Sequence, residues 1–138
     1  MQVFKTSYAG GALTNKPLVV WLDGLSASAS EVLAGALHDN CRAVTVGSTS
    51  FGKGKIQAVF GLGNGEGMTM TVAQYVTPKG TVIQAHGLVP DVPTGGRTNP
   101  YLNLLKSSVS DVGADLSDVD MSAVSTARGT CSPAPSAL

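Results

Sequence analysis

The chain has 138 residues, a length that fits one domain. With 43% hydrophobic and 13% charged residues it is too apolar for a disordered chain, and no apolar run reaches the ~18–20 residues of a membrane span. Nine basic residues balance nine acidic ones, so the net charge gives no general case for binding nucleic acid or an anionic membrane.

The first three predicted elements alternate as strand, helix and strand. Residues 18–22 are a continuous apolar run, typical of a strand that is buried on both faces, and residues 43–46 are predicted as a second buried strand. Residues 31–38 between them form a predicted helix, in which Gly35 costs about 1 kcal/mol relative to alanine and therefore indicates close packing. The order predicts a parallel, right-handed unit. The apolar stripe of the helix is expected to comprise Val32, Leu33, Ala36 and Leu37.

Two alternating strands are predicted next, at residues 56–60 and 68–76. They flank a glycine-rich turn in which Asn64-Gly65 favours positive φ. A short helix is expected at residues 100–106. Together these elements predict an α/β fold with a mixed sheet and flanking helices over residues 1–106.

The last part of the chain differs in composition. Residues 107–138 hold four Asp and one Arg, lack aromatic residues and are rich in Ser, Ala and Pro. Such a segment buries too little apolar area to offset its ordering entropy, so we expect a poorly ordered acidic tail. The two cysteines, Cys41 and Cys131, match neither a disulfide framework nor a four-ligand zinc site, and whether they pair stays open.

A candidate nucleophile lies in the loop after the first strand, which carries Ser26, Ser28 and Ser30. Open α/β sheets place ligands at the carboxyl ends of their strands. A serine there can present its hydroxyl to a cleft, while the next N–H and the helix N-terminus stabilise negative charge. A structural alternative is open, because Ser28 and Glu31 fit the capping-box pattern Ser-x-x-Glu.

No histidine is well placed to act as the base. His38 lies about 15 Å down the predicted helix from Ser28, and His86 is expected at the surface. A metal site would need several carboxylates beside these two histidines, so no cofactor is expected.

The residues after Met1 show no signal peptide, which predicts either a cytosolic protein or a piece that has lost its targeting segment.

Lys53 is the candidate base, in a loop that follows the second strand at the same edge of the sheet. A lysine between two glycines can be partly buried, and it acts as a general base near neutral pH only if its pKa falls from about 10.4 to about 7–8. Ser–Lys dyads are a known arrangement of nucleophile and base.

Three other readings of the Lys53 loop stay open. Gly47-x-x-x-x-Gly52-Lys53 resembles a Walker A loop, but Gly54 replaces the Ser/Thr and a strand is predicted to follow. Ser50-x-x-Lys53 fits a motif of penicillin-binding enzymes that requires a helix. The third reading is a surface lysine on a glycine loop.

Several stretches match one family at its typical spacings, from about Pro17 to Val92. They are Ser26-Ala-Ser-Ala-Ser-Glu31, Ala34-Gly-Ala-Leu-His-Asp-Asn40, Phe51-Gly-Lys-Gly54, Tyr75-Val-Thr-Pro78 and Gly87-Leu-Val-Pro-Asp91. Together they resemble the carboxyl-terminal processing (tail-specific) serine proteases, and the resemblance implies part of a crotonase/ClpP-like protease core.

The resemblance also implies site residues. The family's nucleophile falls on Ser28 and its base on Lys53, with Gln57 orienting the lysine. The N–H groups of Ala29 and Gly24 are the expected oxyanion donors, and Asp39 is a possible accessory acid. On an extended strand Gln57 lies about 13 Å from Lys53, so a hydrogen bond between them requires a bend.

The implied activity is that of a serine endopeptidase that cuts proteins near their C-termini through an acyl-enzyme, without metal or nucleotide. The expected partner is a polypeptide with a free C-terminal tail, in the chloroplast thylakoid lumen or the bacterial periplasm. The PDZ domain and the N-terminal part of the core are expected to be missing from this chain, and any peripheral membrane association would depend on missing regions. The alternatives are a non-catalytic ligand- or protein-binding module of the same fold and an inactive truncated piece.

Overall fold

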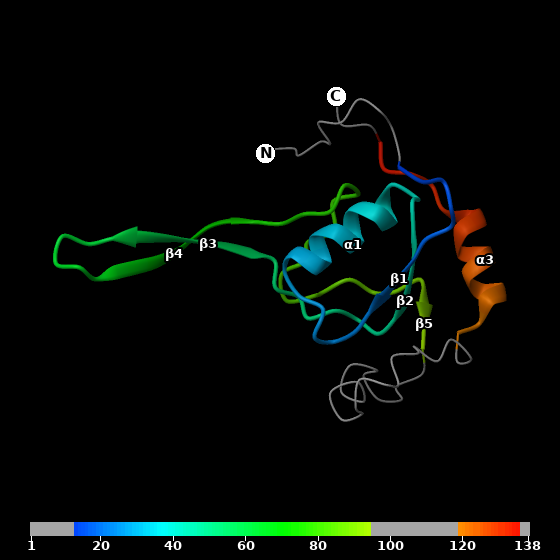
Figure 1. The fold of residues 1–138 in the computed structure, drawn as a ribbon, viewed down its shortest axis with the longest axis horizontal. Helices are drawn as coiled ribbons and strands as arrows, with labels where there is room; N and C mark the ends of the chain where they lie inside the picture. The colour runs from blue at the N-terminus through cyan, green and yellow to red at the C-terminus, as the bar shows by residue number, and fades with distance from the viewer. Residues whose placement is uncertain (1–12, 95–118, 136–138) are drawn as a thin grey trace.

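The computed structural model describes residues 13–94 and 119–135 (Figure 1). The described part contains five strands and two helices, in the order β1 (Val19–Leu22), α1 (Ala29–Asp39), β2 (Val44–Gly47), β3 (Lys55–Gly61), β4 (Gly67–Gln74), β5 (Val92–Pro93) and α3 (Met121–Thr130). None of the described helices is both long enough and apolar enough to cross a bilayer. The helix predicted at residues 100–106 lies outside the described residues.

The centre of the body is a parallel sheet with the strand order β1-β2-β5. Val19 pairs with Val44 and Leu22 with Gly47, so β1 and β2 end at the same edge. Every residue of β2 is buried, as predicted, because β2 is the central strand. The same prediction is wrong for β1, an edge strand in which Val19 is exposed and Leu22 is the only buried residue. The pairing of the strands agrees with the prediction. The predicted parallel unit of strand, helix and strand is therefore confirmed.

Helix α1 buries a different face from the one predicted. Val32 and Leu33 are exposed, and the buried positions are Glu31, Ala34, Gly35 and Asp39. A Cβ atom at Gly35 would lie 2.9 Å from Cγ2 of Thr77, which confirms the close packing expected at this glycine. The buried face consists of small residues and carboxylates because α1 packs closely on loops that supply hydrogen-bond donors.

Strands β3 and β4 form a separate antiparallel hairpin that extends away from the body (Figure 1). Its turn includes Gly65 at a φ of 85°, the positive φ that Asn64-Gly65 predicts. The hairpin exposes many apolar side chains, among them Val59, Phe60, Met70 and Val72. The α/β class is confirmed, with the parallel and the antiparallel pairings in two separate sheets.

The C-terminal segment is more ordered than its composition predicts. Residues 121–130 form α3, which begins at the N-cap Asp120 and lies beside the sheet, opposite α1 (Figure 1). Val119 and Val124 join Val44, Val46 and Val92 in the apolar core. The expectation of a poorly ordered tail is therefore wrong for residues 119–135, and residues 107–118 lie outside the described residues.

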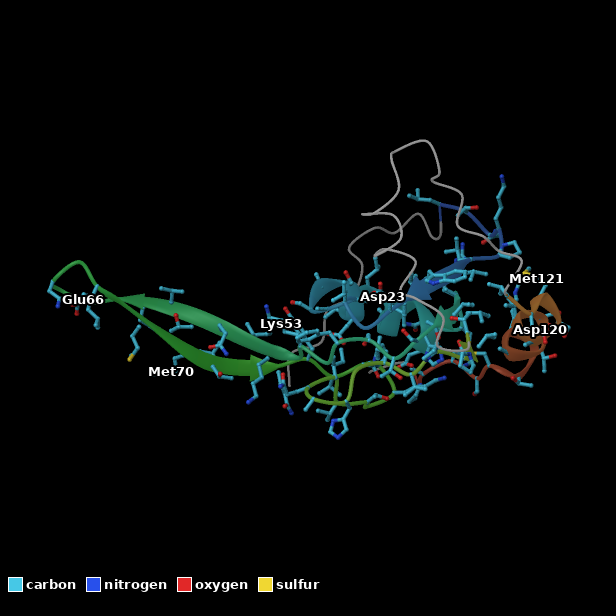
Figure 2. All side chains as sticks on the ribbon, turned by 90° about the horizontal axis from the view of Figure 1, so that it is seen from below. Asp23, Lys53, Glu66, Met70, Asp120 and Met121 are labelled. Atoms are coloured by element: carbon cyan, nitrogen blue, oxygen red, sulfur yellow. A yellow bond between two sulfur atoms is a disulfide. The ribbon has the colours of Figure 1, made fainter. Side chains whose placement is uncertain are left out.

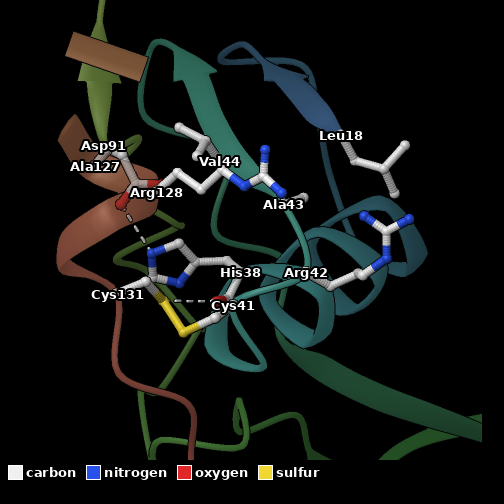
Figure 3. A pocket seen from close by; sticks show the side chains of 10 residues that line it. All are labelled: Leu18, His38, Cys41, Arg42, Ala43, Val44, Asp91, Ala127, Arg128 and Cys131. Carbon is white, nitrogen blue, oxygen red and sulfur yellow. Dashed lines mark hydrogen bonds and ion pairs between the residues drawn. A yellow bond between two sulfur atoms is a disulfide. The ribbon is translucent and has the colours of Figure 1, made fainter. Parts of the chain in front are cut away.

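Cys41 and Cys131 form a disulfide across a sequence separation of 90 residues, with Cα atoms 5.7 Å apart. The bond joins the turn after α1 to the residue that caps α3. Figure 3 shows it beside His38 and Asp91, in a small pocket between the two helices. The disulfide and the valine core together hold α3 against the body.

Candidate active site

The loop after β1 is organised by Asp23, which is 3% exposed. Its Oδ1 accepts hydrogen bonds from the N–H of Leu25 and from both the N–H and the hydroxyl of Ser26, at 2.8–3.0 Å. The Ser26 hydroxyl therefore donates to Asp23 and stabilises the conformation of the loop. Gly24, one of the expected oxyanion donors, is exposed at the tip of this turn.

Ser28 is the N-cap of α1 and has an unusual backbone conformation. Its φ is 54° and its ψ is −115°, a combination that costs a non-glycine residue about 1–3 kcal/mol. Such strain concentrates at functional sites, where the surrounding structure holds it in place. Ala29 follows as the first helical residue, so its N–H has no carbonyl partner within the helix, and the helix dipole favours negative charge here.

Glu31 connects the serine loop to the lysine loop. Its side chain is fully buried and accepts four hydrogen bonds. Oε1 accepts from the Ser50 hydroxyl at 2.5 Å and from the Gly52 N–H at 2.6 Å. Oε2 accepts from the Ser28 N–H at 2.8 Å and from the Lys53 N–H at 2.9 Å. The two backbone nitrogens of Ser28 and Lys53 therefore lie within about 6 Å of each other.

These contacts determine the charge of the Glu31 carboxyl group. Burial raises its pKa, but the hydrogen bonds from Ser50, Gly52, Ser28 and Lys53 outweigh that effect and lower the pKa below its ordinary value. Glu31 is therefore ionised at neutral pH.

The lysine loop reaches this position because glycines flank Lys53. A Cβ atom at Gly52, where φ is 84°, would lie 3.0 Å from the Gly87 nitrogen, and one at Gly54 would lie 2.5 Å from the Gln84 nitrogen. The Phe51 N–H donates to the Ser26 carbonyl at 2.9 Å, which joins the two loops a second time. Residues 48–54 are not helical and lead into β3, contrary to what the penicillin-binding and Walker A readings require.

The Lys53 side chain itself is exposed (Figure 2), where the hairpin leaves the body. The partial burial that a lysine base needs is thus not supplied by the described residues.

Two of the expected site residues lie in other surroundings. The Gln57 amide is on β3 and donates to the Thr71 hydroxyl at 2.8 Å, across the hairpin. Asp39 lies at the far end of α1 from Ser28, where it contacts His38 Nδ1 and accepts from the Lys79 N–H, both at 2.8 Å. The structure brings Ser28, Ala29 and Lys53 together but places neither Gln57 nor Asp39 with them.

A second polar cluster surrounds His38, on the far end of α1. Its Nδ1 contacts Asp39, and its Nε2 lies 2.9 Å from Asp91 Oδ1 (Figure 3). The pKa of Asp39 is raised by burial and lowered more by hydrogen bonds from Thr77, Lys79 and His38, so the net shift is downward. His86 is exposed, as predicted. Across residues 13–94 and 119–135, no group of three His, Cys, Asp or Glu could hold a metal ion.

The sequence pattern predicts Glu31 only as a helix cap. The Ser-x-x-Glu pattern correctly predicts its bond to the Ser28 N–H. The three donors from residues 50–53 come from a loop about 20 residues further on, and no local pattern announces them.

Comparisons with known proteins identify the family of this chain. A family model described as peptidase family S41 matches residues 2–94. The chloroplastic carboxyl-terminal-processing peptidase 3 of Arabidopsis thaliana is 53% identical over 83 residues, which are 60% of this chain and 16% of that protein. The carboxyl-terminal-processing protease of Picosynechococcus sp. is 53% identical over 85 residues, 62% of this chain and 20% of that one.

A solved structure, of a photosystem II D1 C-terminal processing protease, is similar with a TM-score of 0.55 and 52% identity. The similarity covers 56% of this chain and 20% of that one. The chain thus spans only 16% to 20% of the length of these relatives. The resemblance inferred from the sequence is confirmed, since the family model covers well over half of the chain. By sequence match and fold, this chain belongs to peptidase family S41, and the relatives named above are carboxyl-terminal processing proteases.

Proposed function

We propose that this chain carries the nucleophile and the base of a serine endopeptidase that cuts polypeptides near their C-termini. Ser28 is the nucleophile and Lys53 the base. The observation that carries the proposal is the single carboxylate oxygen of Glu31, which accepts from the backbone N–H groups of both residues. The positive φ of Ser28, at the start of a helix, is a second support.

The proposed reaction follows from these positions. The neutral amine of Lys53 takes the proton of the Ser28 hydroxyl, and the oxygen attacks the peptide carbonyl carbon. The N–H of Ala29, with that of Gly24, stabilises the oxyanion. The C–N bond then breaks, the leaving amine takes the proton from Lys53, and an ester to Ser28 remains. Water, deprotonated by Lys53, hydrolyses that ester and restores both residues.

The exposure of Lys53 limits what this chain achieves alone. A lysine is neutral near pH 7 only when desolvated, so we propose that bound substrate or further protein chain covers Lys53 during the reaction. The same observation favours the rival idea of an inactive truncated piece. We expect the 138-residue chain to be a slow protease, because the positioning of a substrate also depends on contacts that the described residues do not supply.

Roles for Gln57 and Asp39 stay predictions. Orientation of Lys53 by Gln57 would require the Gln57 amide to leave Thr71 and the hairpin to change course at its base. A catalytic part for Asp39 would require action across most of the length of α1.

For substrate and location, the relatives give the basis of the proposal. A photosystem II D1 processing protease and chloroplastic peptidases are among them, and others come from bacteria. We propose a polypeptide substrate with a free C-terminal tail, in the chloroplast thylakoid lumen or the bacterial periplasm. The disulfide is typical of such oxidising compartments.

The proposal is tested by covalent labelling of the 138-residue chain with a fluorophosphonate, followed by mass-spectrometric mapping. We expect the label on Ser28 and its loss in Ser28→Ala. Ser30→Ala is the matched control, because Ser30 is exposed on the first turn of α1 and should label normally. A label on another serine would show that Ser28 is not the nucleophile. Absence of any label on the folded chain would favour the non-catalytic reading instead.

A further inference from the structure

We propose that Glu31 is a positioning residue whose Oε2 holds the nucleophile loop and the base loop in register; the inference rests on the proposed roles of Ser28 and Lys53. The chain has two glutamates, and Glu66 is exposed in the hairpin turn. Glu31 is the one that is fully buried, and it saturates its two oxygens with four donors.

Glu31 does more than an ordinary helix cap. Asp120 at the start of α3 shows what a cap requires, since among the described residues its Oδ1 accepts only from Ser122 and Ala123 of its own helix. Glu31 makes one such local bond, to the Ser28 N–H, and three bonds to residues 50–53. Burying a carboxylate is costly unless every lone pair is used, and here the donors from a distant loop supply that compensation.

The two carboxylate oxygens of Glu31 bind different groups. Oε1 holds Ser50 and Gly52, and the Ser50 hydroxyl in turn accepts from the Leu88 N–H at 2.7 Å, which ties the cluster to the next loop. Oε2 holds the backbone of Ser28 and of Lys53 and nothing else among the described residues. Damage at Oε1 therefore loosens the cluster, whereas a shift of Oε2 changes the distance between the two proposed reacting residues.

The side-chain length of residue 31 is therefore the quantity to vary. Glu31→Asp keeps the charge but withdraws the carboxylate by one methylene from both N–H groups. Glu31→Gln keeps the reach, and its amide oxygen fits the position of Oε2. Its NH₂ group then takes the place of Oε1, where it faces the Ser50 hydroxyl, which can accept, and the Gly52 N–H, which cannot, so this variant disturbs only the Oε1 side. Ser50→Ala is the matched control, because it breaks the same buried cluster without touching Oε2.

The experiment measures fluorophosphonate labelling of Ser28 across a range of probe concentrations, corrected for the folded fraction from circular dichroism. For Glu31→Asp we expect the maximal labelling rate to fall by about 100-fold with little change in the half-saturating concentration, since a displacement near 1 Å has that effect on positioned groups. Glu31→Gln and Ser50→Ala should stay within about tenfold of the parent chain.

Two results of the labelling experiment would overturn the inference. If Glu31→Asp labels as fast as Glu31→Gln once corrected for folding, Glu31 is structural only. If Glu31→Gln is the slower variant, the labelling rate depends on the negative charge of Glu31 and not on the length of its side chain.

Amide hydrogen exchange separates this inference from the proposed function. The Ser28 and Lys53 amides should be protected in the parent chain and in Glu31→Gln, and should exchange faster together in Glu31→Asp. A parent chain that shows this exchange pattern but never labels on Ser28 refutes the dyad and leaves the positioning by Glu31 intact. Independent exchange of the two amides refutes the positioning itself.

Discussion

The backbone N–H groups of Ser28 and Lys53 donate to one and the same oxygen atom, Oε2 of Glu31. The two residues lie on different loops, one after β1 and one after β2, and the parallel pairing of these strands brings the loops to one edge of the sheet. The parallel sheet brings the two loops close together, and the hydrogen bonds to the Glu31 carboxylate set the distance between the backbones of Ser28 and Lys53. Changes to either loop are therefore felt at both residues.

The charge state of residue 53 distinguishes a base from an anion anchor. A base must be neutral for part of the time, and arginine is not deprotonated in proteins. Lys53→Arg should therefore label at Ser28 as slowly as Lys53→Ala. Because the side chain is exposed, both variants should fold, which circular dichroism can check. Rapid labelling of folded Lys53→Arg would contradict the dyad and support anion binding.

Stability should fall in acid because two buried carboxyl groups have a lowered pKa in the folded chain, those of Glu31 and Asp39. A carboxyl whose folded pKa is lower than its unfolded pKa stabilises the fold above the unfolded value. That contribution is lost as the pH falls through the folded value. Urea unfolding from neutral pH to about pH 3 should show this loss.

Two variants check the assignment of this acid effect. Glu31→Gln should lose less stability between neutral and acid pH than the parent chain, because it has no carboxyl to protonate at this position. Glu66→Gln, at an exposed position, should follow the parent chain. An identical pH dependence in Glu31→Gln and the parent would show that other groups carry the effect.

The disulfide should contribute strongly to stability. Closing a loop of this length restricts the unfolded chain, and such bonds typically contribute about 2–4 kcal/mol. The double variant Cys41→Ser with Cys131→Ser should unfold at correspondingly lower urea concentration. The parent chain under reducing conditions should match it. An unchanged midpoint in both would show that the valine contacts of α3 hold the segment without the bond.

Gly54 offers a purely steric test of the lysine loop. A Cβ atom there would lie 2.5 Å from the backbone nitrogen of Gln84, so Gly54→Ala forces the two segments apart and should cost about 1–3 kcal/mol. Gly61→Ala, at the last residue of β3, which begins directly after Gly54, meets nothing within 4 Å. Equal unfolding free energies for the two variants would mean that the loop near Gln84 yields without cost.

Much of the framework could be predicted from local pattern. The apolar runs predict β1 and β2, the glycine turn with alternating flanks predicts the hairpin, and the order of elements predicts a parallel unit. The positions of Ser28 and Lys53 at one edge of the sheet follow from that topology alone, because parallel strands share their carboxyl ends.

What could not be predicted depends on partners distant in the sequence. The buried face of α1 contains Glu31 because a loop about 20 residues away supplies its donors, whereas helical periodicity assigns a glutamate to solvent. The order of residues 119–135 has the same origin. Val119 and Val124 gain their burial from strands far upstream, and composition alone cannot show that.

The bond between Cys41 and Cys131 also turns most of the chain into a covalent ring. Strands β2 to β5 and helix α3 lie within that ring, while β1 and α1 belong to the N-terminal segment that precedes Cys41. One backbone cut anywhere between the two cysteines leaves both products attached to each other. Such a nicked molecule keeps the Ser28 loop linked to everything beyond the cut and migrates as a single species until a thiol reductant separates its pieces.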